Sequence, residues 1–514
     1  MSGSDRVGFD NGDVLYMLMP DRFSRGRRGN GAFRQMRDGQ CDRRRPQLRH
    51  GGDLEGIRRH LDYFCDLGVT ALWLTPVLEN DSPARGDSGE VSTYHGYAVT
   101  DFYRVDPRLG SNDDYCRLVS EAHAKGLKVV MDMIFNHCSI DHPWMTDAPL
   151  TTWINRRGEC GHLQTNYKLT TVMDPYAADV DRAETVEGWF VETMPDLNQR
   201  NPHVRRYLMQ NSMWWIETAG INGIRMDTYP YADRQAMAWW MERINAEYPE
   251  FNTVGETWVT ETAYTAAWQK DSGLAGPDSN LKTVMDFALY DHIGLAMTEE
   301  TDGWWSGLNR VYNTLVYDYL YRRPENVMAF LDNHDTDRFL SHGRGVAELK
   351  QALAILLTIR RTPQIYYGTE ILMHGTTART DADVRCDFPG GFPGDRRDAF
   401  TSSGRTSAQR GMYGWLRRVL HWRRGSQAVR YGRQKHFLPH EGVYVIARMY
   451  VPETVVTVLN GTSEWRRVSL GRYGEVLGGW RSATDITTGR RVDLSGGELV
   501  LRPRQSMILV TQRV

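Results

Sequence analysis

Residues 128–137 read KVVMDMIFNH, an apolar run that ends in polar side chains. Short apolar runs of this kind are typical of strands that are buried on both faces of a parallel sheet. Asp132, Asn136 and His137 stand at or just after the carboxyl end of the run. In a barrel of parallel strands the catalytic residues lie at the carboxyl ends of the strands, so ionisable groups at this position favour that fold.

Three other apolar runs, far away in the sequence, end in the same way. Their polar residues are Arg225 and Asp227, then Glu256, then Asn333, His334 and Asp335. Taken singly, each of these groups also fits a structural ion pair or a satisfied buried side chain. The four strand ends together indicate an enzyme, because three carboxylates with an arginine and two histidines suit acid/base and nucleophilic chemistry on an uncharged substrate.

Short apolar segments alternate with amphipathic helical stretches over most of the chain. The expected strands are residues 14–18, 71–74, 128–133, 223–227, 253–256, 283–287, 327–331 and 364–367. The expected helices are residues 54–67, 112–125, 203–218, 234–247, a stretch before residue 323, 346–361 and 408–423. Parallel strands joined by helical crossovers satisfy this order, so the predicted fold class is α/β, a (β/α)8 TIM barrel.

Two regions lack this alternation of strands and helices. From residue 138 to about residue 200 the chain is loop-like and contains several prolines, which is far longer than an ordinary connection. After about residue 425 short β-rich runs are separated by glycine-rich turns. We therefore expect residues 1–137 to form the first part of the barrel, 138–200 a small inserted domain after the third strand, 201–424 the rest of the barrel, and 425–514 a C-terminal antiparallel β-sandwich domain.

The composition argues against several classes of function. A formal net charge of −2 over 514 residues provides no excess of positive charge for binding nucleic acid. No apolar run reaches the roughly 18 residues that a membrane span needs. The six cysteines lack the spacing of a zinc site or of a dense disulfide framework. We expect no nucleic-acid partner, no membrane span and no metal centre.

The order of side chains within the strands supports a catalytic interpretation. Arg225 and Asp227 are two residues apart, so they share one face of their strand. The cation favours the ionised form of the carboxylate, which suits a nucleophile. Glu256 is followed by the bulky Trp258, and a poorly solvated carboxyl group has the raised pKa that a general acid needs.

The segments that carry these groups resemble the motifs of the α-amylase family, glycoside hydrolase family 13. The likeness covers nearly the whole chain, and residues 132–137, 223–227, 255–256 and 333–335 stand in the family order. Residues 194–198, which read MPDLN, are similar to a fifth family segment, and residues 95–97, which read HGY, resemble the family's sugar-stacking turn. The resemblance implies a barrel enzyme that acts on α-glucans.

By that resemblance, Asp227 is the nucleophile, Glu256 the acid/base and Asp335 the transition-state stabiliser. The substrate-binding residues that it implies are His95, Tyr97 as a stacking platform, His137, Arg225, Asn333 and His334. A retaining glycosidase needs two carboxyl groups about 5 Å apart, and neighbouring strand ends can supply that spacing.

Loops near the expected mouth hold further candidates for substrate binding. Arg385 and Asp387, after the last strand, can hydrogen-bond sugar hydroxyls or form a surface ion pair. Trp258 can stack on a sugar ring or pack against the protein, and the same two alternatives apply to Trp144, Phe388 and Phe392.

Within the family the chain is most similar to neopullulanases and cyclomaltodextrinases, especially the periplasmic neopullulanase of Bacteroides starch-utilisation systems. The segments that carry this likeness are YMLMPDRF (16–23), HGGD (50–53), GIRMDTYPY (223–231) and RCDFPGGF (385–392). Such enzymes usually carry an N-terminal β-domain that this chain lacks, so the oligomeric state stays open. The resemblance implies a periplasmic location if an upstream signal has been removed, and a cytoplasmic location otherwise.

Two departures from the family pattern narrow the expected activity. Residues 228–231 read TYPY where typical α-amylases carry a Lys-His pair, which disfavours activity on long starch chains. Residues 24–30 read SRGRRGN where relatives carry an acidic calcium loop, and arginines supply no oxygen ligand and repel the ion. We expect no cofactor, with calcium unsupported in that loop and Asn136 and Asp196 left as candidates for another cation site.

The leading prediction is a retaining hydrolase of α-1,4-glucosidic bonds in maltooligosaccharides, cyclodextrins and pullulan, with α-1,6 bonds as a second linkage. A long loop, residues 368–400, is expected to wall off the donor side of the cleft. One alternative is a transglycosylase on the same scaffold. A second is a non-catalytic glucan-binding or transporter-associated subunit, which is disfavoured because all three carboxylates are present.

Overall fold

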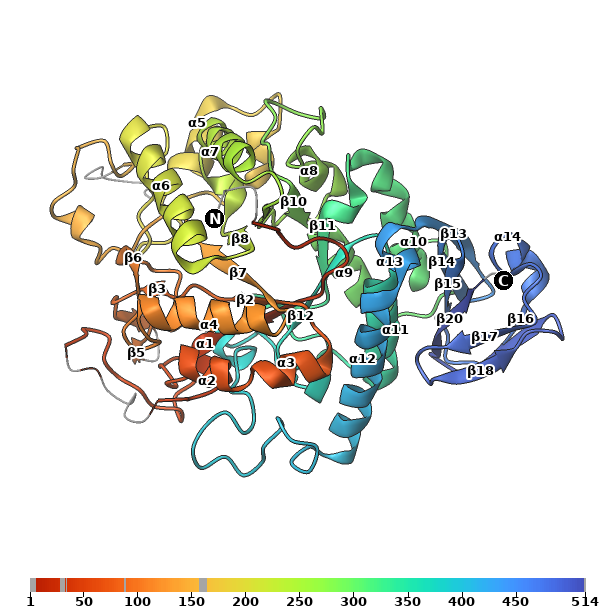
Figure 1. Cartoon of the computed structure of the whole chain (residues 1–514). Helices are drawn as coiled ribbons and strands as arrows, with labels where there is room; N and C mark the ends of the chain where they lie inside the picture. Colours follow the sequence, from red (N-terminus) through yellow and green to blue (C-terminus); the bar gives the residue numbers. More distant parts are fainter. Residues whose placement is uncertain (1–5, 28–32, 34, 87–88, 157–163, 513–514) are drawn as a thin grey trace.

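The computed structural model describes residues 6–27, 33, 35–86, 89–156 and 164–512, and eight parallel strands among them close into a barrel (Figure 1). In chain order the strands are β1 (Leu15–Leu18), β2 (Ala71–Leu74), β7 (Lys128–Met133), β8 (Gly223–Met226), β9 (Asn252–Gly255), β10 (Thr283–Met285), β11 (Val327–Phe330) and β12 (Thr362–Tyr366). Each strand pairs with its neighbours in this order, and β12 pairs with β1 to close the ring. Every strand predicted from the sequence is confirmed to within two residues at either end.

Helices surround the barrel as the sequence predicts. They are α2 (Leu54–Arg59), α3 (Leu61–Leu67), α4 (Asn112–Ala124), α6 (Pro202–Ala219), α7 (Arg234–Glu247), α8 (Thr262–Ala267), α9 (Phe287–Ala296), α10 (Leu308–Val316), α11 (Val346–Thr358) and α12 (Ser407–Gly425). The single helix expected over residues 54–67 is in fact two, because His60 leaves helical geometry with ψ near 16°. The expected start of α4 is confirmed, since Ser111 and Asp114 form a reciprocal capping box.

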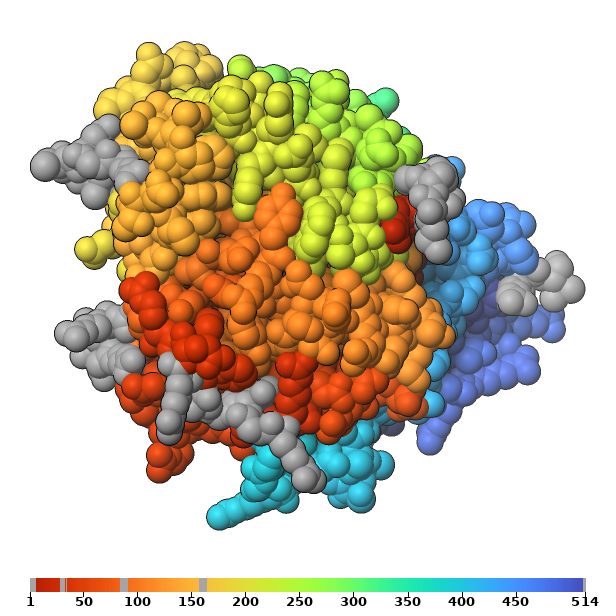
Figure 2. All heavy atoms as spheres, turned by 60° about the vertical axis from the view of Figure 1, so that its left-hand side comes forward, coloured from red at the N-terminus to blue at the C-terminus, as the bar shows by residue number. Residues whose placement is uncertain are grey.

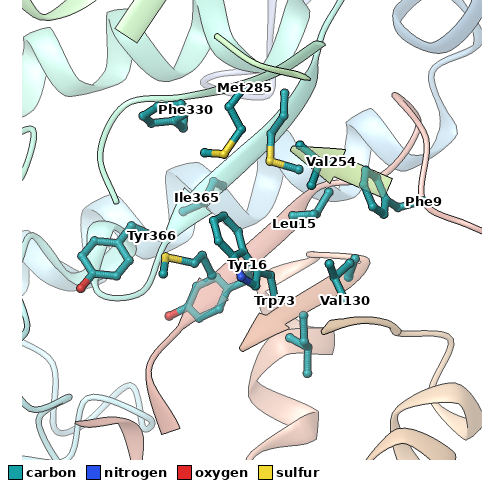
Figure 3. Close-up of a cluster of buried hydrophobic side chains, with 14 of the residues drawn as sticks. Phe9, Leu15, Tyr16, Trp73, Val130, Val254, Met285, Phe330, Ile365 and Tyr366 are labelled. Carbon is teal, nitrogen blue, oxygen red and sulfur yellow. The ribbon is translucent and has the colours of Figure 1, made fainter. Parts of the chain in front are cut away.

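Apolar side chains fill the inside of the barrel. Leu15, Val254 and Met285 come from three different strands and are 0% exposed (Figure 3). Helices cover the outer faces of the strands, so both faces are removed from water and the strands read as continuous apolar runs. Buried polar side chains also occur within the strands, such as Gln364 in β12, but the residues of the expected chemistry lie at or near the carboxyl ends.

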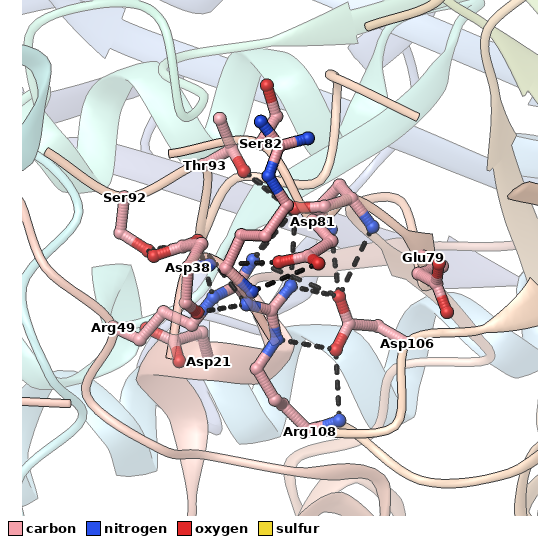
Figure 4. A network of polar contacts seen from close by, with 12 residues as sticks. Asp21, Asp38, Arg49, Glu79, Asp81, Ser82, Ser92, Thr93, Asp106 and Arg108 are labelled. Carbon is pink, nitrogen blue, oxygen red and sulfur yellow. Dashed lines mark hydrogen bonds and ion pairs between the residues drawn. The ribbon is translucent and has the colours of Figure 1, made fainter. Parts of the chain in front are cut away.

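The connection from β2 to α4 is more structured than the sequence indicated. It holds β3 (Leu78–Glu79), β4 (Ala84–Gly86), β5 (Gly89–Val91) and β6 (Asp101–Val105), which form two small antiparallel pairs. Beside them lies a buried ionic network in which Arg49 contacts Asp38 at 3.1 Å and Arg108 contacts Asp106 at 2.6 Å (Figure 4). These fixed contacts support the turn that carries His95 and Tyr97.

The long connection after β7 contains little regular structure. Over its described residues, 138–156 and 164–201, the elements are two 3-10 turns, η2 (Pro143–Met145) and η3 (Leu169–Val172), and one helix, α5 (Asp179–Glu187). An isolated bridge between His137 and Asp196 ties its end back to the end of β7. The predicted domain limits of 138 and 200 stay predictions. In the space-filling view, segments from the first half of the chain cover one face of the molecule, and the C-terminal part projects at one side (Figure 2).

The C-terminal part is antiparallel, as predicted. β13 (Arg433–His440), β14 (Val443–Tyr450), β15 (Glu453–Asn460), β20 (Ser506–Gln512), β17 (Ser482–Asp485) and β18 (Arg490–Asp493) form a six-stranded sheet in that spatial order. β16 (Arg466–Ser469) and β19 (Glu498–Leu501) form a second sheet, and both sheets contribute to one buried apolar cluster. Among the described residues no helix combines the length and the apolar character that crossing a membrane requires.

Candidate active site

A cavity of about 570 Å³ opens at the carboxyl ends of the barrel strands. Its lining residues are His95, Tyr97, His137, Phe190, Met194, Asp227, Thr228, Tyr231, Glu256, Trp258, Asp335, Asp381 and Arg385. The cavity lies within the size range of small-molecule sites. Three carboxylates that are separated by up to 108 residues in the sequence, Asp227, Glu256 and Asp335, therefore share one cavity.

Arg225 lies beneath the cavity and links two of these carboxylates. Its Nη1 is 2.7 Å from Oδ1 of Asp227, and its Nη2 is 2.6 Å from Oε1 of Glu256. The same Nη1 donates to Oδ1 of Asp132 at 2.9 Å. Because a guanidinium is a planar fork with fixed donor directions, it sets the relative positions of carboxylates on the adjacent strands β8 and β9.

Asp132 is a positioning residue and does not line the cavity. Its Oδ2 accepts hydrogen bonds from Nε1 of Trp73 at 3.0 Å and from the hydroxyl of Tyr97 at 2.9 Å. Burial raises the pKa of Asp132 to about 7, although Arg225 opposes that rise. Asp132 thus anchors both the arginine and the tyrosine whose ring faces the cavity.

Glu256 has the protonation behaviour of a general acid. Burial raises its pKa to about 8, Arg225 acts in the opposite direction, and the negative charges of Asp227 and Asp335 raise it further. Oε2 of Glu256 accepts a 2.9 Å hydrogen bond from the backbone N–H of Thr228, which sits in left-handed geometry with φ 45°. The carboxyl group is therefore held in place, and burial favours its protonated form.

The rings of His95, Tyr97 and His137 form one wall of the cavity, and His334, which does not line the cavity, packs against Tyr97. The ring of Tyr97 stacks on His334 with centroids 5.2 Å apart and on His95 with centroids 5.8 Å apart. Nε2 of His137 donates to the carbonyl oxygen of Tyr97 at 3.2 Å. Burial lowers the pKa of all three histidines, so they are neutral and present hydrogen-bonding groups without charge.

Arg385 and Asp387, the two candidates from the last loop, have different environments. Nη2 of Arg385 lies 2.7 Å from Oδ1 of Asp335, and its Nε donates to the carbonyl oxygen of His334 at 2.7 Å. Asp387 is not among the cavity-lining residues, because its carboxylate is engaged by Arg43 at 2.7 Å and by His50 at 2.6 Å. The structure therefore shows the ion pair for Asp387, and its predicted contact with sugar stays a prediction.

Asn333 is also absent from the cavity wall. It is 1% exposed, and its Oδ1 accepts the backbone N–H of Asp335 at 2.8 Å. That bond fixes the turn that presents the Asp335 carboxylate. Asn333 thus supports the turn of Asp335, and the contact with substrate that the resemblance implies for it stays a prediction.

The aromatic candidates divide between stacking and packing. Trp258 lines the cavity, is 43% exposed and stacks on Phe287 with centroids 4.8 Å apart. The others pack against the protein: Phe388 on Phe23, Phe392 under Arg43, and Trp144 on Phe102. Only Trp258 of these four therefore offers a ring face to a ligand in the cavity.

Five cavity residues were not predicted as site residues: Phe190, Met194, Thr228, Tyr231 and Asp381. Phe190 stacks on His137 with centroids 5.5 Å apart, and Tyr231 meets Phe190 edge-on at 5.4 Å. Phe190 and Met194 lie in the irregular connection after β7, where no periodicity indicates the direction of a side chain. The sequence signal that pointed toward Tyr231 was its place in the TYPY run next to Asp227.

The positions considered for a cation are only partly occupied by protein partners. Among the described residues, Oδ1 of Asn136 and Oδ1 of Asp196 are buried and accept no hydrogen bond. Oδ2 of Asp196 accepts from Nδ2 of Asn155 at 2.7 Å. The carboxylate of Asp53, next to the basic loop, accepts backbone N–H groups of Gly26, Arg27 and Gly56 at 2.7–2.9 Å. Residues 28–30 of that loop lie outside the described residues. Within the described part of the chain, no group of three or more His, Cys, Asp or Glu side chains is arranged to hold a metal ion.

Comparison with known proteins agrees with this geometry. Residues 17–410 match the family described as alpha amylase, catalytic domain, and residues 434–510 match the cyclo-malto-dextrinase C-terminal domain. The chain is 28% identical to a cyclomaltodextrin glucanotransferase of Geobacillus stearothermophilus, over 96% of this chain and 67% of the relative. It is also 28% identical to a cyclomaltodextrinase of Thermoanaerobacter pseudethanolicus, over 96% of this chain and 77% of the relative.

A solved structure gives the same result for the whole chain. The α-amylase of Anoxybacillus superposes with a TM-score of 0.79 at 27% identity and covers 98% of both chains. The present chain spans about two thirds of the length of the glucanotransferase named above.

Proposed function

Because the chain belongs to the α-amylase family, we propose that it hydrolyses α-1,4-glucosidic bonds with retention of configuration. One observation carries the proposal: Asp227, Glu256 and Asp335 line a single cavity while Arg225 binds the first two from below. This arrangement supplies a nucleophile, an acid and a third negative charge around one ligand position. Double displacement at a sugar carbon needs these groups.

In the first step, Asp227 attacks the anomeric carbon and forms a glycosyl ester. Its Oδ1 is bound to Arg225, and its Oδ2 accepts from the hydroxyl of Thr228 at 3.1 Å, so the carboxylate is oriented before substrate arrives. Glu256 gives its proton to the departing glycosidic oxygen in the same step. Asp335 lines the same cavity and would stabilise the positive charge that develops on the sugar ring.

In the second step, Glu256 acts as the base for the incoming nucleophile. The ester has then neutralised Asp227, which is one of the charges that raise the pKa of Glu256. Loss of that charge lowers the pKa of Glu256 and favours its deprotonated form. The same side chain can therefore donate a proton in one step and accept one in the next.

We propose short and cyclic α-glucans as the preferred substrates. The loop after β12 reaches the cavity through Asp381 and Arg385, which supports a restricted donor side. Met194, from the segment similar to that of enzymes that act on both α-1,4 and α-1,6 bonds, lines the cavity as well. A relative that is named cyclomaltodextrinase supports cyclodextrins as substrates, and pullulan would be cleaved at its α-1,4 bonds.

A transglycosylase remains the second candidate, and one observation favours it. The matching relative from Geobacillus stearothermophilus is named a glucanotransferase. Both reactions pass through the glycosyl ester on Asp227 and differ only in whether water or a sugar hydroxyl resolves it.

The product profile on γ-cyclodextrin, pullulan, soluble starch and maltotriose tests the proposal. We expect maltose and glucose from γ-cyclodextrin, with a higher kcat/KM than on starch. Products longer than the starting maltotriose would identify a transglycosylase. A clear preference for starch would contradict the assignment of short and cyclic substrates, and absence of turnover on all four would contradict the enzyme assignment itself.

A further inference from the structure

Two neighbouring tryptophans stand largely in solvent and share a hollow with the turn that joins β13 to β14. Trp304 is 88% exposed and Trp305 is 74% exposed, in the connection between α9 and α10. Within the described residues, neither indole stacks on another ring or donates a hydrogen bond. Adjacent aromatic rings that remain in water are the mark of a binding surface.

The connection that carries the two rings is rigidly held. Nδ2 of Asn309 donates to the carbonyl oxygen of Gly303 at 2.9 Å, and Nδ2 of Asn313 donates to that of Trp304 at 3.3 Å. The backbone N–H of Thr301 donates to Gly461 of the C-terminal domain at 3.0 Å. Because the backbone is already fixed, a ligand that stacks on the rings has little loop entropy to overcome.

Two hollows flank Trp305. One, of about 600 Å³, lies between this connection and the turn that joins β13 to β14, with Glu441 and Arg466 in its wall. The other, of about 620 Å³, extends from Trp305 past Tyr319, which is 74% exposed, to Thr260. Trp305 and Asn313 line both hollows, so the two form one continuous surface.

The polar groups of this surface match a carbohydrate better than a protein partner. Asn309 and Asn313 are four residues apart on α10 and so share one face of the helix. Their Oδ1 atoms accept no hydrogen bond within the described part of the chain, which leaves them available to sugar hydroxyls. Carboxylates of Asp302 and Glu441 interrupt the aromatic area, whereas a protein interface core is depleted in charge.

No residue of the two hollows lines the catalytic cavity. The second hollow nevertheless begins at Thr260, two residues after Trp258 of that cavity, which is at most about 8 Å along the backbone. We propose that Trp304 and Trp305 form a second, non-catalytic binding site for α-glucan chains. This inference rests on the proposed function, and it assigns to the surface the capture of a polymer outside the catalytic cavity.

Affinity electrophoresis in native gels that contain amylopectin tests the site. In the double variant W304A/W305A we expect binding about tenfold weaker than in the wild type, because two stacking faces are lost. The matched control is Y176A, which removes a 93% exposed aromatic ring that lines neither hollow and should leave the retardation unchanged. Turnover of p-nitrophenyl maltotrioside by W304A/W305A should stay within about twofold of wild type, since a short substrate does not span the two sites.

A variant of the catalytic cavity separates the two sites. Y97A should lose turnover of the short substrate and keep its retardation by amylopectin. Retardation that survives in W304A/W305A and disappears in Y97A would place polymer binding in the catalytic cavity and overturn the proposal. So would a wild-type protein that amylopectin does not retard, or a double variant that changes the sedimentation coefficient while it binds the polymer normally, because the rings would then be a subunit contact. A wild-type protein that is retarded through Trp304 and Trp305 but cleaves no α-glucan would refute the proposed function and leave this site standing.

Discussion

Nη2 of Arg225 lies 2.6 Å from Oε1 of Glu256, and both side chains are buried. The guanidinium nevertheless leaves this carboxyl group with a raised pKa, because burial and the charges of Asp227 and Asp335 act in the opposite direction. The contact therefore positions the acid without forcing it into the ionised form. A single arginine can in this way orient a nucleophile and a protonated acid on adjacent strands.

Asp227→Asn is expected to reduce kcat on maltooligosaccharides by about a thousandfold or more, because an amide cannot form the glycosyl ester. The amide nearly preserves the volume and can still accept from Arg225, so the melting temperature should change little. Mechanism-based labelling with a fluorinated glycosyl fluoride, followed by peptide mapping, checks the assignment. Label found on a residue other than Asp227 would refute it.

Glu256→Gln should remove proton donation, with a loss of about 10² to 10⁴ in kcat/KM on substrates that have sugar leaving groups. With an α-maltosyl fluoride, whose leaving group needs little protonation, the loss in the glycosylation step should be much smaller. Single-turnover rates on both substrates measure the difference. Equal losses would show that Glu256 is not the acid.

The value of kcat/KM should stay high up to about pH 8 and fall as the pH rises further. Glycosylation requires protonated Glu256, its pKa in the folded enzyme is raised to about 8, and activity is therefore lost as the pH rises through that value. Rates on maltotriose from about pH 5 to about pH 10 give the profile. A decline that already begins at the pKa of an ordinary exposed carboxyl group would contradict the assignment. In Glu256→Gln the alkaline decline should be missing from the pH profile on α-maltosyl fluoride.

Chelation by EDTA should leave both the activity and the melting temperature unchanged. Asp53 is occupied by three backbone N–H groups and Oδ2 of Asp196 is bonded to Asn155, so these oxygens have partners without a metal. Oδ1 of Asp196 and Oδ1 of Asn136 are buried without a hydrogen-bond partner in the described part of the chain, and they are where a cation would bind if the prediction fails. A ligand stabilises a fold only if it binds the native state. Scanning calorimetry with and without EDTA measures the effect; a drop of several degrees that calcium reverses would reveal a cation site.

The barrel and its carboxylates follow from local sequence. Each strand is a short apolar run, and the polar residue at its end needs no long-range information to be found, as residues 128–137 and 223–227 illustrate. The resemblance to family motifs then assigns expected roles to Asp227, Glu256 and Asp335. The alternation of side chains also predicts that Arg225 and Asp227 share a face, which their 2.7 Å contact bears out.

Tertiary contacts between distant segments decided which loop side chains belong to the cavity. Asp387 and Arg385 are two residues apart in one loop, yet Asp387 meets Arg43 and His50 from the first barrel segment, whereas Arg385 meets Asp335. Phe190 faces the cavity because an irregular connection folds back over His137, and such a segment has no period from which a direction can be derived. The chain by itself thus determined which strands form and which ionisable groups end them, because both depend on neighbours in sequence. Packing between segments that are distant in sequence decided which loop side chains reach the cavity and left Trp304 and Trp305 in water.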